Sequence, residues 1–374
     1  MDDPPGKTDG AMIPLFERYP HLAEKLSRLS FGEFPTPVEK LSGLCSRLNR
    51  DNLYIKRDDL SSRTYGGNKV RKLEFLLADA LKHGAVRIVT AGGAGSNHAL
   101  ATALYAKQVG LKAVIMLYRQ PDSHSVRDNL LMDLYSKAEL FHHDTYEEHL
   151  QAFKEAVRLY ELTDGRVPYI VPLGGSSPVG AIGFVNAGFE LAAQIAAGEV
   201  PLPSRIYLAL GTMGTTAGLL LGLKASGINV CLHAVRVVPT YVADMDKCRF
   251  LFRQTNELLR KLAPSFPFFD TIGPAEFSIC DDYFGEKYGM YTPEAVAAKK
   301  LLRESDGIIL DGTYTGKAFA AFIADAGSGD DGPILFWHTK NSRPFPPGAL
   351  EADYRLLPTS FHRYFTEPVQ LLDM

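Results

Sequence analysis

Cysteine is scarce in this chain and widely spaced. Among 374 residues only Cys45, Cys231, Cys248 and Cys280 are cysteines, and none belongs to a Cys-x-x-Cys pair. Neither a zinc site nor a disulfide framework is indicated, so we expect no metal centre. Buried free thiols are typical of a reducing compartment, and we therefore expect a cytoplasmic protein.

An excess of basic charge is lacking as well. The net charge is −3 at pH 7, which provides no positive field for nucleic acid or an anionic membrane, and we expect neither as a partner. The N-terminal sequence MDDPPG lacks the basic segment and apolar run of a secretory signal. We expect the first ten residues to form a disordered tail, and we identify no stretch long and apolar enough to span a bilayer.

The length of the chain exceeds that of one compact core and predicts two domains. Strand-like and helix-like segments alternate, which predicts βαβ units and parallel sheets. The expected strands are residues 86–90, 112–118, 139–143, 205–210, 230–238, 307–311 and 333–339. The expected helices are residues 97–109, 123–136, 146–160, 216–226 and 316–326. Because such sheets bind ligands beyond the carboxyl ends of their strands, the loops after strands are the candidate sites.

The segment TYGGNKVRKLE, residues 64–74, opens a further predicted helix that ends at Gly84. Its first turn contains three cations, Lys69, Arg71 and Lys72, whereas a helix N-terminus normally prefers acids. Each cation placed there costs a few tenths of a kcal/mol, up to about 1 kcal/mol. A bound anion, most often phosphate, would offset that cost.

Lys69 has two interpretations at this point. Positive surroundings lower the pKa of a lysine and favour the neutral amine that forms a Schiff base. In the alternative, Lys69 is a solvated lysine whose charge is relieved by Asp58 and Asp59, just upstream. The segment alone leaves both interpretations open.

Two glycine-rich loops follow predicted strands. In the first, AGGAGSNH at residues 91–98, Ser96 or Asn97 would serve as a helix cap even without a ligand. The second, GTMGTTAG at residues 211–218, combines glycines with threonine hydroxyls at a helix start and predicts a phosphate site. Neither loop contains a P-loop or a G-x-G-x-x-G pattern, which argues against a nucleotide site.

Four motifs occur in a fixed order: GGNKVRKLE at residues 66–74, SNH at 96–98, GTMGTTAGL at 211–219 and LDGTYTGKA at 310–318. Together they resemble the 1-aminocyclopropane-1-carboxylate deaminase and D-cysteine desulfhydrase group of pyridoxal-phosphate enzymes. The likeness extends from FPTP, residues 34–37, to Thr339. One motif would be weak, but four in order with comparable spacing are specific.

The resemblance implies the fold of type II pyridoxal-phosphate enzymes, which is like that of the tryptophan synthase β-chain. This is an α/β fold of two domains with open, twisted, mostly parallel sheets and pyridoxal 5′-phosphate in the cleft between them. We expect residues 1–71 and 182–374 to form a large cofactor-binding domain, with a small domain at residues 72–181 inserted in it. The resemblance also implies a homodimer.

The resemblance further implies roles for single residues. Lys69 would hold the cofactor as a Schiff base and later carry the proton of the substrate Cα. Asn97 would bond the phenolic oxygen of the cofactor. Ser96 and His98, with Asn97 between them, would bind the substrate carboxylate, and Ser96 would also take part in proton transfer. The cofactor phosphate would lie on Gly211, Thr212, Met213, Gly214 and Thr215, with help from Lys72.

Two tyrosines and a threonine complete the implied site. Tyr288 and Tyr314 match catalytic tyrosines that flank the substrate, although both residues would also suit aromatic packing. Thr339 would lie near the pyridine nitrogen. The preceding His338 fits a core histidine equally well.

Two positions indicate the reaction. Where the deaminases have a glutamate that pairs with the pyridine nitrogen, this chain has Thr315, and a hydroxyl makes a weaker electron sink. His98 stands where the deaminases usually have glutamine. Both differences favour β-elimination, in which D-cysteine yields pyruvate, sulfide and ammonia.

Two alternatives remain open at this point. The chain departs from the desulfhydrase pattern at Met213, at the pair Gly312-Thr313 and in the segment HTKNS at residues 338–342. Deamination of 1-aminocyclopropane-1-carboxylate to 2-oxobutanoate and ammonia is therefore the second reaction considered. A pyridoxal-phosphate-binding protein without turnover is the alternative from another class.

Overall fold

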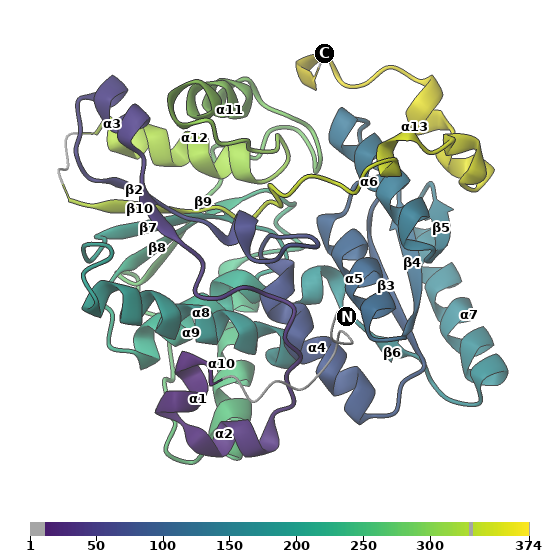
Figure 1. Cartoon of the computed structure of the whole chain (residues 1–374), viewed down its shortest axis with the longest axis horizontal. Coiled ribbons are helices and arrows are strands. Elements are labelled where there is room, and N and C mark those ends of the chain that lie inside the picture. Colours follow the sequence, from purple (N-terminus) through teal and green to yellow (C-terminus); the bar gives the residue numbers. More distant parts are fainter. Residues whose placement is uncertain (1–11, 329–331, 374) are drawn as a thin grey trace.

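A computed structural model describes residues 12–328 and 332–373, and two parallel-stranded sheets dominate it (Figure 1). The tail predicted for residues 1–10 lies outside the described residues. The larger sheet has six strands in the order β1-β2-β10-β7-β8-β9 and the smaller has four in the order β5-β4-β3-β6. These two sheets agree with the α/β fold that the sequence predicts.

The large sheet is parallel except at one edge, where β1 (Val38–Lys40) pairs antiparallel with β2 (Leu53–Lys56). The last strand in the chain, β10 (Ile334–Trp337), lies between β2 and β7 (Arg205–Leu210). All four residues of β10 are buried, as expected of a parallel strand that is covered on both faces. β8 (Cys231–Arg236) and β9 (Phe277–Cys280) complete the sheet.

Helices cover both faces of this sheet (Figure 1). One face carries α1 (Pro14–Arg18), α2 (Pro20–Lys25), α8 (Pro178–Ala196), α9 (Gly214–Ala225) and α10 (Met245–Leu262). The other carries α3 (Ser42–Leu48), α11 (Pro293–Asp306) and α12 (Thr315–Ala326). A methyl group placed on Gly222 of α9 would lie 2.2 Å from the carbonyl oxygen of Val185, so glycine allows α8 and α9 to pack backbone to backbone.

By length and composition α8 is apolar enough to cross a membrane, which corrects the expectation that no stretch is. In the structure 72% of its apolar stretch is buried, mainly by α4, α9 and α10. The helix therefore has the packing of a core helix.

The small sheet is wholly parallel and consists of β5 (Glu139–His143), β4 (Lys112–Tyr118), β3 (Arg87–Gly93) and β6 (Tyr169–Ile170). α7 (Tyr146–Asp164) covers one face. The other face carries α4 (Lys69–Lys82), α5 (Asn97–Gln108) and α6 (His124–Ser136). α4 also packs against α8, so it joins the two sheets.

Short 3-10 turns link these elements: η1 (Asp58–Leu60), η2 (Leu173–Gly175), η3 (Ala349–Glu351), η4 (Tyr354–Leu356), η5 (Thr359–Phe361) and η6 (Leu371–Asp373). With α13 (Arg363–Thr366), the last turns lie beside α6 and β5 (Figure 1). The segment thus packs on the small sheet, although the predicted division assigned residues 182–374 to the large domain. The predicted limits at 71/72 and 181/182 fall inside α4 and α8, and the division itself stays a prediction.

Most of the predicted elements are present. The strands at 112–118, 139–143 and 205–210 are confirmed with the same bounds. The strand expected at residues 307–311 is wrong, because this apolar stretch is a loop. Ile308 and Leu310 pack into the core from that loop, while Asp311 accepts hydrogen bonds from the backbone at the start of α12.

A buried ion network ties α4 to the large sheet. Arg71 donates from Nη2 to Asp58 at 2.7 Å and from Nη1 to Glu190 of α8 at 2.8 Å. Lys56 of β2 donates to the same Glu190 at 2.6 Å. Burial alone would raise the pKa of Glu190, but the two cations outweigh burial and lower the pKa to about 2. The network therefore fixes the first turn of α4 against α8 and β2.

We expect Glu190→Gln to lower the free energy of unfolding by about 3–5 kcal/mol, because it leaves buried Arg71 and Lys56 without their shared carboxylate. Denaturant titration followed by circular dichroism measures this loss. Glu24→Gln is the control, since that carboxylate is exposed, and it should change stability by at most about 0.5 kcal/mol. Equal losses in the two variants would contradict the role of the network.

The same contribution should depend on pH. The pKa of Glu190 is about 2 in the folded protein, below its ordinary value of 4.5. A depressed carboxyl pKa stabilises the folded state above the ordinary value and loses that effect as the pH falls through the folded value. The stability difference between the native chain and Glu190→Gln should therefore shrink between pH 4.5 and about 2.

Candidate active site

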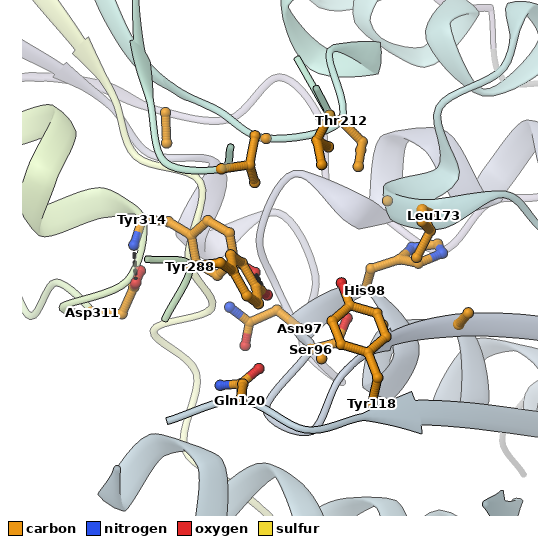
Figure 2. A pocket seen from close by; sticks show the side chains of 18 of the residues that line it. Ser96, Asn97, His98, Tyr118, Gln120, Leu173, Thr212, Tyr288, Asp311 and Tyr314 are labelled. Carbon is orange, nitrogen blue, oxygen red and sulfur yellow. Dashed lines mark hydrogen bonds between the residues drawn. The ribbon is translucent and has the colours of Figure 1, made fainter. Parts of the chain in front are cut away.

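A cleft of about 1120 Å³ lies at the carboxyl ends of β3 and β4 of the small sheet and of β7, β8 and β10 of the large one. This is where parallel α/β sheets bind ligands. With the exception of Gly214, every predicted site residue lines it: Lys69, Lys72, Ser96, Asn97, His98, Gly211, Thr212, Met213, Thr215, Tyr288, Tyr314 and Thr339. Figure 2 shows part of this lining, with Asn97, Tyr288 and Tyr314 on one side.

Lys69 is the first residue of α4, and the GGN turn before it is fixed from several sides. Gly67 has a φ of +95°, a conformation that glycine adopts without strain. The amide of Asn68 donates to Thr339 O at 3.1 Å. Lys69 Nζ donates to Asn68 Oδ1 at 2.9 Å. Burial lowers the pKa of Lys69 to about 8, although the charge of Asp311 acts in the opposite direction.

The alternative in which Asp58 and Asp59 relieve the charge of Lys69 is wrong. Asp58 pairs with Arg71, and Asp59 pairs with Arg57 at 2.9 Å. Lys69 therefore keeps the lowered pKa that suits a nucleophilic amine.

Lys72 is a buried lysine with no carboxylate partner among the ion pairs of the described residues. Its Nζ donates to Gly174 O at 3.0 Å. Burial and the nearby charge of Lys69 hold the pKa of Lys72 well below its usual range. A methyl group placed on Gly214 would lie 2.9 Å from this Nζ, so Lys72 points at the start of α9. An anion bound there would pair with it.

The loop before α9 presents further donors. Met213 adopts a left-handed φ of +67°, unusual for a residue with a side chain and often found at functional sites. The amide of Gly214 donates to Ser176 Oγ at 3.0 Å, and Ser176 Oγ also bonds Thr212 Oγ1 at 2.8 Å. The hydroxyl of Thr216 lines the cleft, is buried and has no hydrogen-bond partner in the part of the chain that the structure describes. Such donors at a helix N-terminus suit a phosphate.

Ser96 and Asn97 form the start of α5. Ser96 Oγ accepts from Ala99 N at 3.2 Å, so its capping role is confirmed. Asn97 Oδ1 accepts from Tyr65 Oη at 3.1 Å and from Asn129 Nδ2 at 2.9 Å. With the oxygen fixed in this way, the Nδ2 of Asn97 is available as a donor to a ligand in the cleft.

His98 faces the interior more than its neighbours do. Its Nε2 lies 3.0 Å from Thr90 Oγ1, and its Nδ1 lies 3.5 Å from Thr102 Oγ1. Burial, followed by the charges of Lys69 and Lys72, holds the pKa of His98 well below its usual range. His98 is therefore neutral, and contact with a substrate carboxylate stays a prediction.

The hydroxyls of Tyr288 and Tyr314 bond each other, and their rings meet edge to face (Figure 2). Burial raises the pKa of both phenols, so both stay protonated at neutral pH. Asp311 holds the backbone beneath this pair, because its Oδ1 accepts from the amides of Thr313 at 2.9 Å and Tyr314 at 2.5 Å. The pair can therefore donate one proton toward the cleft.

Thr315 and Thr339 occupy different places. Thr315 does not line the cleft, and its Oγ1 donates to Asp311 Oδ2 at 2.6 Å. Thr339 does line it, beside the GGN turn. His338 is fully buried and lies 3.8 Å from Asp59, as a core histidine would. In the part of the chain that the structure describes, no group of three His, Cys, Asp or Glu residues could hold a metal.

Asp311, Thr216 and Gln120 are among the lining residues that sequence reasoning missed. Asp311 and Thr216 lie inside motifs that were recognised, so their place beside a helix start was the available signal. Gln120 follows β4, and its Oε1 is buried without a partner. Its position after a predicted strand was the only indication in the sequence.

Comparison with known proteins decides the family. The model of the family described as pyridoxal-phosphate dependent enzymes matches residues 29–340. The chain belongs to this family. It is similar to the D-cysteine desulfhydrase of Yersinia enterocolitica, with 39% identity over 85% of this chain and 95% of that one. The D-cysteine desulfhydrase of Salmonella typhimurium is 37% identical over the same shares.

A solved structure shares the fold of this enzyme. It is described as an ACC deaminase homologue, and it matches with a TM-score of 0.74 and 32% identity over 87% of this chain and 94% of that one. The expected fold of a type II pyridoxal-phosphate enzyme is thus confirmed.

The residues of the cleft fit pyridoxal phosphate. Lys72, the unpartnered Thr216 hydroxyl and the N-terminus of α9 offer an anion site for the phosphate. Lys69 offers an amine with a pKa of about 8 for the covalent bond. Asn97 Nδ2 could bond the ring oxygen, because Tyr65 and Asn129 fix the other end of the side-chain amide. These groups belong to α4, α5 and α9, so helices of both sheets contribute to one cofactor site.

The rate at which cofactor-free protein captures pyridoxal phosphate should rise with pH and level off above about pH 8, because only the neutral amine of Lys69 attacks. Stopped-flow absorbance measures it. Asp311→Asn should move the midpoint to lower pH, since it removes the charge that raises the pKa of Lys69. A rate that still climbs tenfold per pH unit at pH 10 would refute the lowered pKa.

Proposed function

We propose that this enzyme catalyses β-elimination from a small D-amino acid, with D-cysteine giving pyruvate, sulfide and ammonia. The observation that carries the proposal is the bonded pair of neutral tyrosines, Tyr288 and Tyr314, in the cleft that also contains Lys69. The D-cysteine desulfhydrases that match nearly their full length to this chain support the choice of substrate.

The chain supplies a base and an acid for this reaction. When bound, the cofactor withdraws electrons from the substrate Cα. Lys69 Nζ takes the Cα proton and holds it. The C–S bond then breaks, and its electron pair leaves with sulfur as hydrosulfide. Tyr288 or Tyr314 donates a hydrogen bond to that sulfur, and Ser96 and Asn97 orient the carboxylate. Water converts the remaining unsaturated amino acid to pyruvate and ammonia.

Asp311 and the threonine at position 315 favour elimination over opening of a cyclopropane ring. Position 315, where a deaminase glutamate would stand, holds a threonine directed at Asp311. Asp311 is itself occupied by bonds from Thr313, Tyr314 and Thr315. Neither Asp311 nor position 315 therefore offers a free carboxylate to support the electron sink, whereas a substrate with a Cα proton and a good leaving group needs less support.

The second candidate is deamination of 1-aminocyclopropane-1-carboxylate to 2-oxobutanoate and ammonia. The solved structure described as an ACC deaminase homologue favours it, since that protein shares the fold over most of its length. A binding protein without turnover is disfavoured, because the curated relatives that match are enzymes.

The cofactor-loaded enzyme should release sulfide and pyruvate in equal amounts from D-cysteine and much more slowly from L-cysteine. Lys69→Ala should abolish turnover, because it removes both the cofactor bond and the base. Lys82→Ala, an exposed lysine on the same helix, is the control and should keep full activity. Release of 2-oxobutanoate from the cyclopropane substrate, without sulfide from D-cysteine, would replace the proposed function by the second candidate.

Replacing either tyrosine should lower kcat more for a substrate with a poor leaving group than for one with a good leaving group. Tyr288→Phe and Tyr314→Phe remove one hydroxyl each. Whichever of the two hydroxyls donates to the sulfur, its removal should lower kcat for D-cysteine about 10²- to 10⁴-fold. β-Chloro-D-alanine should lose much less, because chloride is a better leaving group than hydrosulfide and depends less on a hydrogen-bond donor. Steady-state kinetics on both substrates measures the difference, and equal losses would exclude acid assistance by the pair.

We also propose a cytoplasmic location and a homodimer. The four cysteines are all free, which supports a reducing compartment. The homodimer is supported by the resemblance to the family, and sedimentation equilibrium of the loaded enzyme tests it.

A further inference from the structure

The last part of the chain reaches the active site. Residues 354–373, called the C-terminal strap below, run from η4 through α13 to η6. Five of its residues line the catalytic cleft: Arg363, Tyr364, Glu367, Pro368 and Gln370. The family match ends at residue 340, so the strap lies beyond the part of the chain that identifies the family.

The strap is anchored on the small sheet by a hydrophobic face. Leu357, Phe361 and Tyr364 are at most 3% exposed and pack into one core with residues of β4, α5 and α6. The hydroxyl of Tyr364 accepts from the backbone amide of Gln120 at 3.3 Å. It also lies 3.2 Å from Nε2 of His142 on β5. The strap therefore holds the end of β4, where the small sheet meets the cleft.

Gln370 connects the strap to the opposite wall of the cleft, on the side of Tyr288. Its Nε2 donates to Asp122 O at 3.2 Å, on the small-sheet side, and to Gly289 O at 3.1 Å. Its Oε1 accepts from the amide of Tyr291 at 2.7 Å. The amide of Gln370 donates to Asp122 O at 3.1 Å. One side chain thus bonds the loop after β4 and the loop that carries Tyr288.

The two loops that Gln370 joins are in direct contact. Gly289 has a φ of +83°, and a methyl group placed on it would lie 3.1 Å from Pro121 Cδ. A methyl group on Gly93 would likewise meet Gln120 Oε1 and, at 2.9 Å, the ring of Tyr288. Tyr288 is therefore closely packed, and its position depends on how the loop after β4 and the loop that carries Tyr288 lie against each other.

We propose that Gln370 is a positioning residue for Tyr288. By fixing Gly289 and Tyr291 against Asp122, it holds the Tyr288 hydroxyl on Tyr314 and aims the pair at the departing group. The inference rests on the proposed function for its effect on turnover, because it assigns the tyrosine pair to the elimination step. The strap is accordingly part of the active site.

Two Gln370 variants and a control test this proposal in the cofactor-loaded enzyme. Gln370→Met keeps the volume of the side chain and removes its hydrogen bonds. Gln370→Glu keeps an acceptor for the Tyr291 amide but has no donor for Asp122 O and Gly289 O. Leu371→Ala changes the neighbouring residue, which is 80% exposed, and serves as the control. Kinetics with D-cysteine and amide hydrogen exchange are measured for all three and for the native chain.

Gln370→Met should lower kcat about 10- to 100-fold, because small displacements of a catalytic group have effects of that size. KM and the visible absorbance of the cofactor should change little, since binding residues lie elsewhere. Exchange of the Tyr291 amide should become faster in Gln370→Met than in Gln370→Glu, and Leu371→Ala should match the native chain in both measurements.

Native kcat in Gln370→Met would overturn the proposal, as would a fall in kcat that merely follows loss of cofactor. If Gln370→Met does not fold, a native kcat in Gln370→Glu would overturn it equally. Failure of the proposed function is a separate outcome, in which the native enzyme releases no sulfide from D-cysteine. Unchanged exchange at Tyr291 in Gln370→Met would then still reject the positioning role.

Discussion

The guanidinium of Arg71 fixes the part of the molecule on which the active site depends. It lies in the first turn of α4, between Lys69 and Lys72, and it holds Asp58 and Glu190 while Lys56 supplies a second cation. Breaking a buried network of this kind is costly, because one charge is left without a partner. The network therefore holds the start of α4 in one position against the large sheet, and α4 carries both functional lysines into the cleft.

Arg71 also binds carboxylates that could otherwise pair with Lys69 and Lys72. Asp58 and Glu190 are bound to it, so neither forms an ion pair with Lys69 or Lys72 at the positive end of the helix. Burial lowers the pKa of Lys69 to about 8. Lys72 points at the start of α9, where the buried Thr216 hydroxyl has no hydrogen-bond partner among the described residues. The phosphate of the cofactor would supply negative charge beside Lys72, and the carbonyl group of the cofactor would react with the amine of Lys69.

Local patterns predicted the strands and the loops that follow them, because parallel strands are continuous apolar runs and glycine loops end them. The same patterns failed at residues 307–311, where Ile308 and Leu310 are buried by tertiary packing without a strand partner. Gln120 and Gln370 could not be predicted as neighbours of the site. They are 250 residues apart and meet the same cleft only because the strap folds back on the small sheet.

The position of the covalent bond shows whether Lys69 holds the cofactor. The loaded enzyme is reduced with borohydride and digested, and the modified lysine is identified by mass spectrometry. A pyridoxyl group is expected on Lys69 alone, and none on the other lysines at or near the cleft, Lys72, Lys287, Lys317 and Lys340. A label on any of these in place of Lys69, or a loaded protein that takes no label, would contradict the account.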